Sequence, residues 1–451
     1  MKKLLIAGAL CVGLAGVAGA AKVTVDAGQA IGPVKPVNSV GQPPLIGGPG
    51  HYWMLHYLKD AGIPYSRLHD VGGRYGRNVY ADIPNLFRNF DADENDPKNY
   101  DFAFTDDLIH QLATNNVKPW FRLGVTIENY PKIAKYRIFP PKDYAKWARI
   151  CEHVIRHYNE GWANGMKLGI EYWEIWNEAD LNPNPDESMT WAGTFDQYCE
   201  FYGVAARHLK GCFPHLKIGG PASCGLYAAD NPMARGQVRY HVDCCKQFLD
   251  YVRDNKVPMD FFSFHSYASA KNVMQQVAAA RRLLNERGLG AAETWLNEWL
   301  CHHKHEYLGT AFQAAGIAAE LIGLQNSEVS GACIYDARCG VGDYSPLFNP
   351  LTYKPHKAYY VFTAFNELRK LGTAVKATSD SGDVWVTAAA RGSCCAVMLA
   401  NETNKPIPLE FDFGEMSFSG CRITDRDRTA AKVDRLEALP PESFCVIWLK
   451  K

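Results

Sequence analysis

The chain has 451 residues, more than one ordinary domain needs and enough for a large barrel with a smaller partner. Its hydrophobic content of 47% and charged content of 21% are typical of a globular protein with a substantial core. Lysine plus arginine and aspartate plus glutamate both number 48, so no net field favours nucleic acid or an anionic membrane surface.

Residues 1–20 have the features of a secretory signal peptide. Two lysines precede an apolar run over residues 4–17, and the small residues Ala-Gly-Ala follow at 18–20. The run is too short to span a bilayer comfortably and lacks a good lipoprotein cleavage site, so we expect no membrane anchor. We expect a mature chain that begins near Ala21 and is secreted or periplasmic.

Residues 21–35 contain one alternating segment, 22–26, which predicts a lone strand that joins the C-terminal domain. From 36 to 371, short apolar strands alternate with amphipathic helices, which is typical of βα units. The predicted strands are 36–40, 65–68, 118–123, 172–177, 217–220, 261–265, 294–298 and 331–335. The predicted helices are 54–61, 106–115, 144–157, 196–210, 242–255, 273–287 and 311–324. The strand count, and the polar and acidic residues at strand ends, favour a (β/α)8 TIM barrel over a doubly wound sheet.

Residues 372–451 change to an alternating pattern interrupted by turns, which predicts an antiparallel β-sandwich domain. The predicted strands are 383–389, 394–400, 407–413, 421–425 and 444–449. Loss of the signal peptide would leave an odd number of the 14 cysteines, with the spacing of neither a disulfide framework nor a zinc site. We expect mostly buried thiols, and the compartment allows one or two disulfides.

Two motifs carry the candidate chemistry. Residues 173–178 read Trp-Glu-Ile-Trp-Asn-Glu and end the fourth strand, whereas residues 294–299 read Thr-Trp-Leu-Asn-Glu-Trp and end the seventh. All strand C-termini of a barrel open onto one face, so Glu178 and Glu298 can converge there. Either each glutamate is an ordinary ion-pair member, or the two form a catalytic pair; two such motifs on these strands favour the pair.

Retaining glycoside hydrolysis needs such a pair. A protonated carboxyl gives its proton to the leaving oxygen, and an ionised carboxylate roughly 5–5.5 Å away attacks the anomeric carbon. The negative charge of the nucleophile raises the pKa of its partner, so acid and base coexist at one pH. Asn177, next to Glu178, is placed to hydrogen-bond a sugar hydroxyl.

With these motifs the chain resembles clan A, the large clan of retaining barrel glycosidases with acid and nucleophile on strands four and seven. Within it, the chain is similar to glycoside hydrolase family 39, which includes β-xylosidases and α-L-iduronidases. The resemblance covers nearly the whole chain, including Ser-Arg-Leu-His-Asp at 66–70, the acidic run at 91–97, Phe-His-Ser-Tyr at 264–267 and the closing sandwich. It implies Glu178 as acid/base and Glu298 as nucleophile, and it carries the His-x-Tyr pair of the family onto His265 and Tyr267.

Both motifs depart from those of the family's xylosidases. Residues 179–181, Ala-Asp-Leu, follow Glu178 where Pro-Asn-Leu is typical. Asn297 precedes Glu298 where Thr is usual. Trp-Leu follows Glu298 where an aromatic residue and Asn are usual. The chemistry does not depend on these neighbours but the sugar subsite does, so the resemblance leaves the sugar open.

Five further residues are candidates for substrate binding, each with a structural alternative. Tyr267 either orients the nucleophile or is a cleft tyrosine without that role. His265 and His69 either bind sugar hydroxyls or are structural histidines. Arg67 holds the nucleophile ionised, is a buried salt bridge, or does both. Tyr335 either forms an aromatic platform under the sugar or packs in the core.

Residues 301–305, Cys-His-His-Lys-His, offer four metal-ligand side chains after the seventh strand. Consecutive positions rarely present a tetrahedral set, and the lysine repels a cation, so a substrate-facing loop is favoured over a metal site. The chain has no His-Glu-x-x-His sequence, and the glycines at 47–50 lack a P-loop lysine. We expect neither a metal nor another cofactor.

We interpret the chain as a retaining, exo-acting, β-xylosidase-like glycoside hydrolase whose partner is an oligosaccharide or glycoside, not nucleic acid. The alternatives are another clan A glycosidase, namely an arabinosidase, glucosidase or uronidase, or a glycan-binding protein without catalysis. The presence of both glutamates argues against the last. The sequence predicts no oligomeric state.

Overall fold

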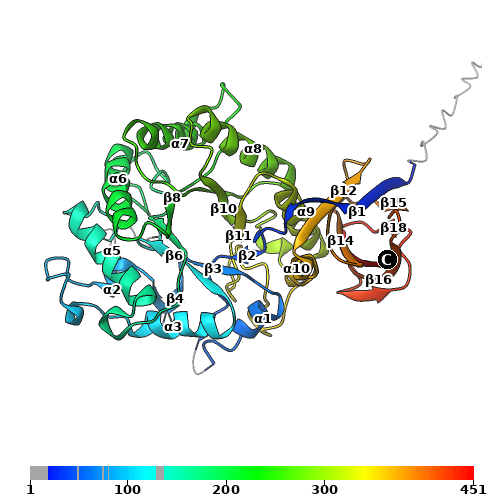
Figure 1. Ribbon diagram of the computed structural model, residues 1–451, viewed down its shortest axis with the longest axis horizontal. Helices are drawn as coiled ribbons and strands as arrows, with labels where there is room; N and C mark the ends of the chain where they lie inside the picture. Colours follow the sequence, from blue (N-terminus) through cyan, green and yellow to red (C-terminus); the bar gives the residue numbers. More distant parts are fainter. Residues whose placement is uncertain (1–18, 48–49, 74–75, 80, 128–136) are drawn as a thin grey trace, which may run out of the picture.

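The computed structural model describes residues 19–47, 50–73, 76–79, 81–127 and 137–451. Most of the predicted signal peptide lies outside these residues. A barrel ringed by helices occupies one end of the molecule and an antiparallel sheet the other (Figure 1). No helix among the described residues is both long and apolar enough to cross a membrane.

Eight parallel strands close into the barrel in the order β10-β11-β2-β3-β6-β7-β8-β9. Their bounds are β2 Ser39–Val40, β3 Tyr65–Leu68, β6 Lys118–Leu123, β7 Tyr172–Ile175, β8 Lys217–Ser223, β9 Phe261–Ser266, β10 Glu293–Trp299 and β11 Gly331–Ile334. Each predicted barrel strand overlaps one of these, and the predicted fold class is confirmed. A short hairpin, β4 Gly72–Gly73 and β5 Gly76–Val79, follows β3 and was not predicted.

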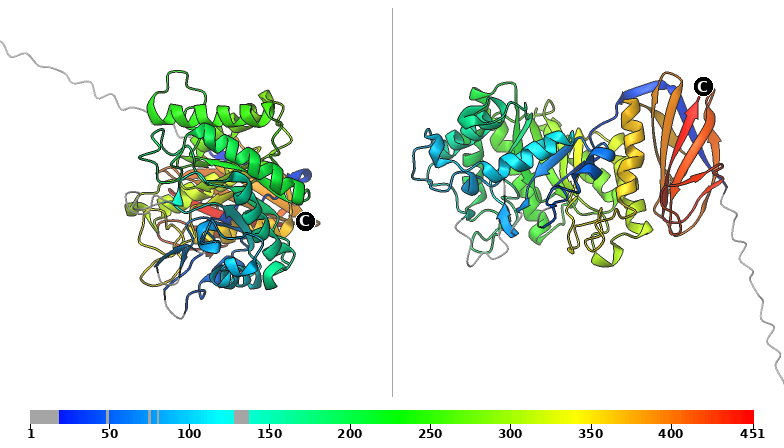
Figure 2. Two further views of the ribbon diagram at one scale, coloured as in Figure 1. Left: turned by 90° about the vertical axis from the view of Figure 1, so that its left-hand side faces the viewer. Right: turned by 90° about the horizontal axis from the view of Figure 1, so that it is seen from below.

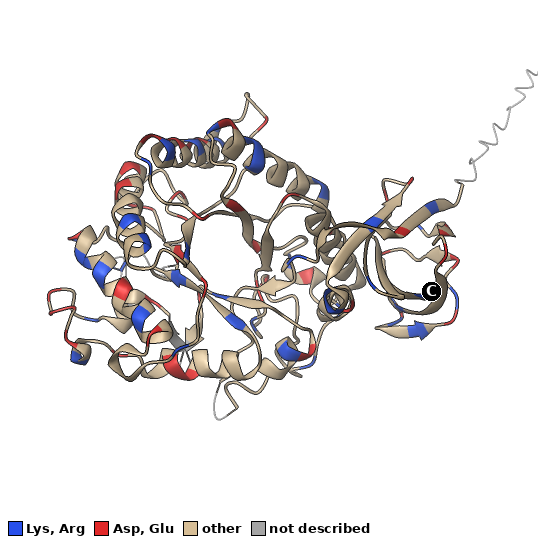
Figure 3. Cartoon of the chain, viewed as in Figure 1, with Lys and Arg blue, Asp and Glu red and all other residues tan. Residues whose placement is uncertain are grey.

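The helices surround the strands. They are α1 Leu55–Asp60, α2 Ile83–Leu86, α3 Ala103–Thr114, α5 Tyr144–Asn159, α6 Phe195–Cys212, α7 Gly236–Asp254, α8 Ala270–Glu286, α9 Ala311–Asn326 and α10 Tyr359–Leu371, with 3-10 turns at Pro97–Asn99, Trp162–Asn164 and His305–Tyr307. Helix α6 starts at a capping box between Thr194 and Gln197, which satisfies two free N–H groups at its N-terminus. Charged residues of both signs occur along the outer helices (Figure 3), as expected of amphipathic helices that cover a sheet.

Helices α9 and α10 lie between the barrel and the C-terminal sheet (Figure 2). Almost every residue of α9 is buried, because one side faces the barrel and the other faces the sheet. Helix α10 was not predicted, although its buried residues Val361, Phe362, Phe365 and Leu368 follow a helical period. It completes the eighth βα unit.

The C-terminal region is one curled sheet of nine strands in the order β17-β16-β19-β14-β13-β12-β1-β15-β18. Their bounds are β1 Ala21–Pro33, β12 Thr373–Ser379, β13 Trp385–Arg391, β14 Cys394–Asn401, β15 Ile407–Asp412, β16 Ser417–Thr424, β17 Ala431–Val433, β18 Ala438–Leu439 and β19 Ser443–Lys450. The N-terminal strand β1 pairs with β12 antiparallel and with β15 parallel, so the two ends of the chain meet in one sheet. Strands β12, β17 and β18 were not predicted.

Alternation along the strands gives this sheet two apolar faces. Val397, Leu399 and Ile447 belong to a core enclosed by the curled sheet, whereas Met398 and Val446 join the main core against α9 and α10. This double burial explains why β13, β14 and β19 are apolar at nearly every position. All thirteen cysteines of the described chain are free thiols, so the disulfides that the sequence allowed are absent from that part.

An aromatic cluster fills the inside of the barrel at the N-terminal ends of the strands. Trp120, Tyr172, Phe261 and Trp295 pack together, with the Trp120 and Trp295 ring centroids 4.2 Å apart. Tight packing there leaves the carboxyl ends of the strands as the open end of the barrel.

We predict that Trp120→Ala lowers the free energy of unfolding by about 3–5 kcal/mol, because truncation leaves a cavity that the closed barrel cannot fill. Urea unfolding followed by circular dichroism measures the change. The control is Trp53→Ala, whose side chain is 56% exposed and whose loss should change stability little. Equal effects of the two variants would contradict the role of the cluster.

Candidate active site

Both predicted catalytic glutamates lie at the carboxyl end of the barrel. Glu298 is the sixth residue of β10, and Glu178 follows β7 after a turn in which Trp176 and Glu178 have positive φ, 73° and 47°. The Glu178 backbone N–H donates to the Ala222 carbonyl at 3.0 Å, and the Thr190 hydroxyl donates to the Glu178 carbonyl at 2.6 Å. These bonds hold a conformation that non-glycine residues rarely adopt and turn Glu178 toward the barrel axis.

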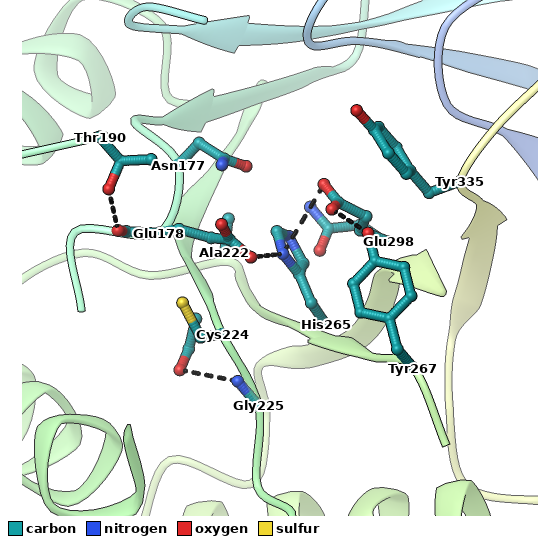
Figure 4. Close-up of polar contacts among 12 residues, drawn as sticks. Asn177, Glu178, Thr190, Ala222, Cys224, Gly225, His265, Tyr267, Glu298 and Tyr335 are labelled. Atoms are coloured by element: carbon teal, nitrogen blue, oxygen red, sulfur yellow. Dashed lines mark hydrogen bonds and ion pairs between the residues drawn. The ribbon is translucent and has the colours of Figure 1, made fainter. Parts of the chain in front are cut away.

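A carboxylate oxygen of Glu178 lies within 4.8 Å of one of Glu298. His265, on β9, lies between them (Figure 4). Its Nδ1 is 2.7 Å from Glu178 Oε1 and 3.7 Å from Glu298 Oε2. The spacing of the carboxylates agrees with the roughly 5–5.5 Å of retaining glycosidases and is too short for the water that inverting enzymes place between theirs.

Glu298 is held by two direct contacts. Arg67, on β3, donates from Nη1 to Oε2 at 3.1 Å, and the Tyr267 hydroxyl donates to Oε1. Glu298 is only 6% exposed. A carboxylate fixed at both oxygens keeps one orientation, which is what a nucleophile requires.

The surroundings separate the proton affinities of the two glutamates. Burial raises the pKa of Glu178 to about 8, and the charge of Asp180 adds to this. Burial also raises the pKa of Glu298, but the Arg67 guanidinium and the Tyr267 hydroxyl oppose that rise. Burial lowers the pKa of His265, so its ring is neutral at pH 7. The one proton of the pair therefore belongs on Glu178, the member without a guanidinium contact.

Arg67 is the centre of a wider buried network. Its Nε donates to Glu174 Oε2 at 2.8 Å and its Nη2 to Asn177 Oδ1 at 2.5 Å. Glu174 Oε1 accepts from the Ser263 hydroxyl at 2.6 Å and from the Asn297 amide. Glu174 is fully buried, and the sequence analysis gave it no role. The sequence did contain a signal for this role. Glu174 is a charged residue in the middle of an apolar strand, and a buried charge needs a partner.

The structure thus brings four candidate substrate-binding residues to the glutamates: Arg67, Asn177, His265 and Tyr267. The other two candidates, His69 and Tyr335, contact Asp70. His69 Nε2 lies 3.2 Å from Asp70 Oδ1, and the Tyr335 hydroxyl donates to Asp70 Oδ2 at 2.8 Å. Tyr335 is only 8% exposed, and its ring centroid is 6.4 Å from that of Tyr267, so it supports the site wall.

Residues 301–305 diverge. Cys301 is buried, and the ring of His302 packs 4.1 Å from that of Phe312, away from the site. His303 instead stacks on Tyr344, with centroids 5.5 Å apart, and Tyr344 is edge-on to Tyr267 at 5.2 Å. Among the described residues, no cluster with metal-ligand spacing includes a residue of this loop. Tyr344, which reaches the site from the loop after β11, was not predicted from the sequence.

Glu178, His265 and Glu298 themselves have metal-ligand spacing. The guanidinium of Arg67 is bonded to Glu298 and the charge of Arg67 also acts on Glu178, which opposes a second cation there. The arrangement is suited to proton transfer and nucleophilic attack.

Comparison with known proteins gives a match to one family model. The sequence profile described as Glycosyl hydrolases family 39 matches residues 60–288. The chain is 29% identical over 217 residues to a protein named Beta-xylosidase from Geobacillus stearothermophilus, and 25% identical over 279 residues to another of that name from Caldicellulosiruptor saccharolyticus. These matches cover 44% and 58% of this chain, but only 37% and 50% of the two relatives.

Solved structures show the same fold over nearly the full chain. A glucosidase from Croceicoccus marinus has a TM-score of 0.74 at 20% identity, covering 96% of this chain and 100% of its own. A GH39 enzyme from Xanthomonas axonopodis pv. citri has a TM-score of 0.69 at 16% identity, covering 98% and 100%.

We predict that Glu178 makes stability depend on pH. Its folded pKa of about 8 lies above its ordinary value of 4.5, so the folded chain binds the extra proton and the free energy of unfolding falls as pH rises through that window. Glu178→Gln should remove this part of the slope and gain stability relative to wild type at pH 9 but not at pH 4.5.

Thermal midpoints at several pH values measure the effect. Glu187→Gln, an exposed change in the same loop, is the control and should keep the wild-type slope. A Glu178→Gln slope equal to that of wild type would show that Glu178 is not protonated in the folded chain.

Proposed function

This chain belongs to glycosyl hydrolases family 39, and we propose that it is a retaining glycoside hydrolase with Glu178 as acid/base and Glu298 as nucleophile. The observation that carries the proposal is the pair of buried carboxylates within 4.8 Å, only one of which contacts a guanidinium. That asymmetry supplies one acid and one nucleophile in a single site.

In the first step, a Glu298 oxygen attacks the anomeric carbon while the bond from that carbon to the leaving oxygen breaks. Glu178 gives its proton to the leaving oxygen, and a glycosyl ester forms on Glu298. Arg67 and Tyr267 hold the attacking carboxylate in line. Asn177 accepts from Arg67 through its Oδ1, which leaves its amide N–H groups to donate to a sugar hydroxyl.

In the second step, Glu178 takes a proton from water as the water oxygen attacks the same carbon and releases Glu298. The ester on Glu298 has no negative charge, so ionisation of Glu178 no longer places two negative charges next to each other. Glu178 is thus ionised, and can accept a proton, at the point where a base is needed. His265 Nδ1, 2.7 Å from Glu178, holds the carboxyl in place through both steps.

We propose β-xylosides as the first substrate class, with exo action on an oligosaccharide or glycoside. Both relatives named Beta-xylosidase support this choice. Arabinosides, glucosides and uronides are the alternatives. A purely glycan-binding role is disfavoured, because it would not need an acid and a nucleophile in different electrostatic surroundings. We also propose a secreted or periplasmic location, on the basis of residues 1–20.

We predict that the two glutamates respond differently to mutation, on the substrate that a panel of nitrophenyl glycosides selects for wild type. Glu178→Ala should lose activity on poor leaving groups but keep it on an activated aryl glycoside, and azide should accelerate turnover and yield a retained glycosyl azide. Glu298→Ala should lose the two-step route for every leaving group, because no ester forms.

Product analysis by NMR distinguishes the roles, since any azide product of Glu298→Ala should be inverted. Azide rescue of Glu298→Ala with retention would reverse the assignment. If Glu178→Ala loses activity equally on activated and unactivated substrates, Glu178 is not the acid.

We predict that Glu174→Gln lowers kcat/KM about 10²-fold, although Glu174 itself does not contact the substrate. The reason is that Arg67 and Asn297 lose the charge that positions them. The acidic limb of the pH profile should also move to lower pH, because removal of one negative charge makes Glu298 easier to ionise. Glu171→Gln, exposed just before the start of β7, is the control. Lower activity with an unmoved pH profile would contradict the electrostatic part of this role.

A further inference from the structure

The outer face of the barrel carries a second cluster of titratable side chains, on two packed helices. Glu152 lies on α5, and His208 and Cys212 lie in the last turns of α6. His208 and Cys212 are four residues apart and therefore share one helix face, which α5 covers. The carboxylate, imidazole and thiol atoms all lie within 4.8 Å of one another.

We propose that Glu152, His208 and Cys212 form a binding site for one divalent metal ion of the zinc type. Thiolate, imidazole and carboxylate are the donor set that Zn²⁺ takes, and three protein ligands leave a fourth position for water. The side chains of Glu152 and His208 are 15% and 30% exposed, so water and the ion have access. The site is independent of the proposed hydrolase activity.

The distances fit the ion with small adjustments. His208 Nε2 is 2.7 Å from Glu152 Oε2 and 3.9 Å from Cys212 Sγ. Tetrahedral zinc with ordinary bond lengths separates neighbouring ligand atoms by roughly 3.3–3.6 Å. The ion would insert into the His208–Glu152 hydrogen bond and open it by less than about 1 Å, while the thiol draws closer.

The neighbouring charges leave one carboxylate oxygen of Glu152 available to bind the ion. Arg156 is bonded to Glu152 through Oε1 at 2.8 Å and also to Glu160, so Oε2 faces His208 and Cys212. An outer partner of this kind orients a ligating carboxylate. The positive charge of Arg156 is offset by Glu160, so Glu152 and a Cys212 thiolate together balance the two charges of the ion.

Binding requires one proton to leave. Burial and Glu152 raise the pKa of the Cys212 thiol, so the S–H bond breaks and its proton passes to solvent as the metal–sulfur bond forms. The bound ion would link α5 to α6, the helices on either side of β7 in the chain, and so stabilise the folded state by mass action.

Co²⁺ titration of the chelator-treated full chain tests the site, because thiolate ligation gives an intense near-ultraviolet charge-transfer band. We expect the band to saturate at one equivalent, to vanish on addition of Zn²⁺, and to be absent from Cys212→Ser and strongly reduced in His208→Gln. Cys394→Ser, which removes an exposed thiol on β14, should keep it. The active-site cluster contains no thiol, so an ion bound there gives no such band.

Absence of the band from wild type, or its persistence in Cys212→Ser, would overturn the proposal. A second measurement uses wild type alone, in case the variants do not fold. Zn²⁺ should slow iodoacetamide alkylation of Cys212 at least about 10-fold by mass spectrometry, as expected for a thiolate held by metal. An unchanged alkylation rate at saturating Zn²⁺ would equally overturn it.

Discussion

The site depends on placing two like-charged carboxyl groups close together at the carboxyl end of the barrel. Within 4.8 Å of each other and in low dielectric, two negative charges repel strongly, so the pair favours a single proton and a single charge. Arg67 and Tyr267 contact Glu298, whereas Glu178 has the neutral ring of His265 as its close partner. The acid and the nucleophile are therefore distinguished by their partners, not by their residue type.

The barrel supplies these partners from separate strands. Arg67 comes from β3, Glu174 from β7, Ser263 from β9 and Asn297 from β10, and Glu174 is bonded to the other three. A buried ion pair contributes little net stability, and removal of one member leaves an uncompensated charge. Its value here is orientation: four strands must be in register before the nucleophile is held beside Glu178.

The sequence predicted those features that depend on the spacing of apolar residues along a single helix or strand. The strand at 65–68 and the two glutamate motifs could be placed because parallel strand ends share one face. The pairing of Tyr335 with Asp70 could not be predicted, because it joins residues far apart in the chain. Helix α10 was missed although its pattern was present. Strands β17 and β18 are too short to leave a pattern.

Trapping of the covalent intermediate tests the central assignment most directly. A 2-deoxy-2-fluoro glycoside with a good leaving group slows both steps and lets the ester accumulate, because the fluorine destabilises the oxocarbenium-like transition states. Mass spectrometry of the digested protein should then locate one glycosyl adduct on Glu298. An adduct on Glu178 or on any other residue, from a chain that hydrolyses the parent glycoside, would contradict the account.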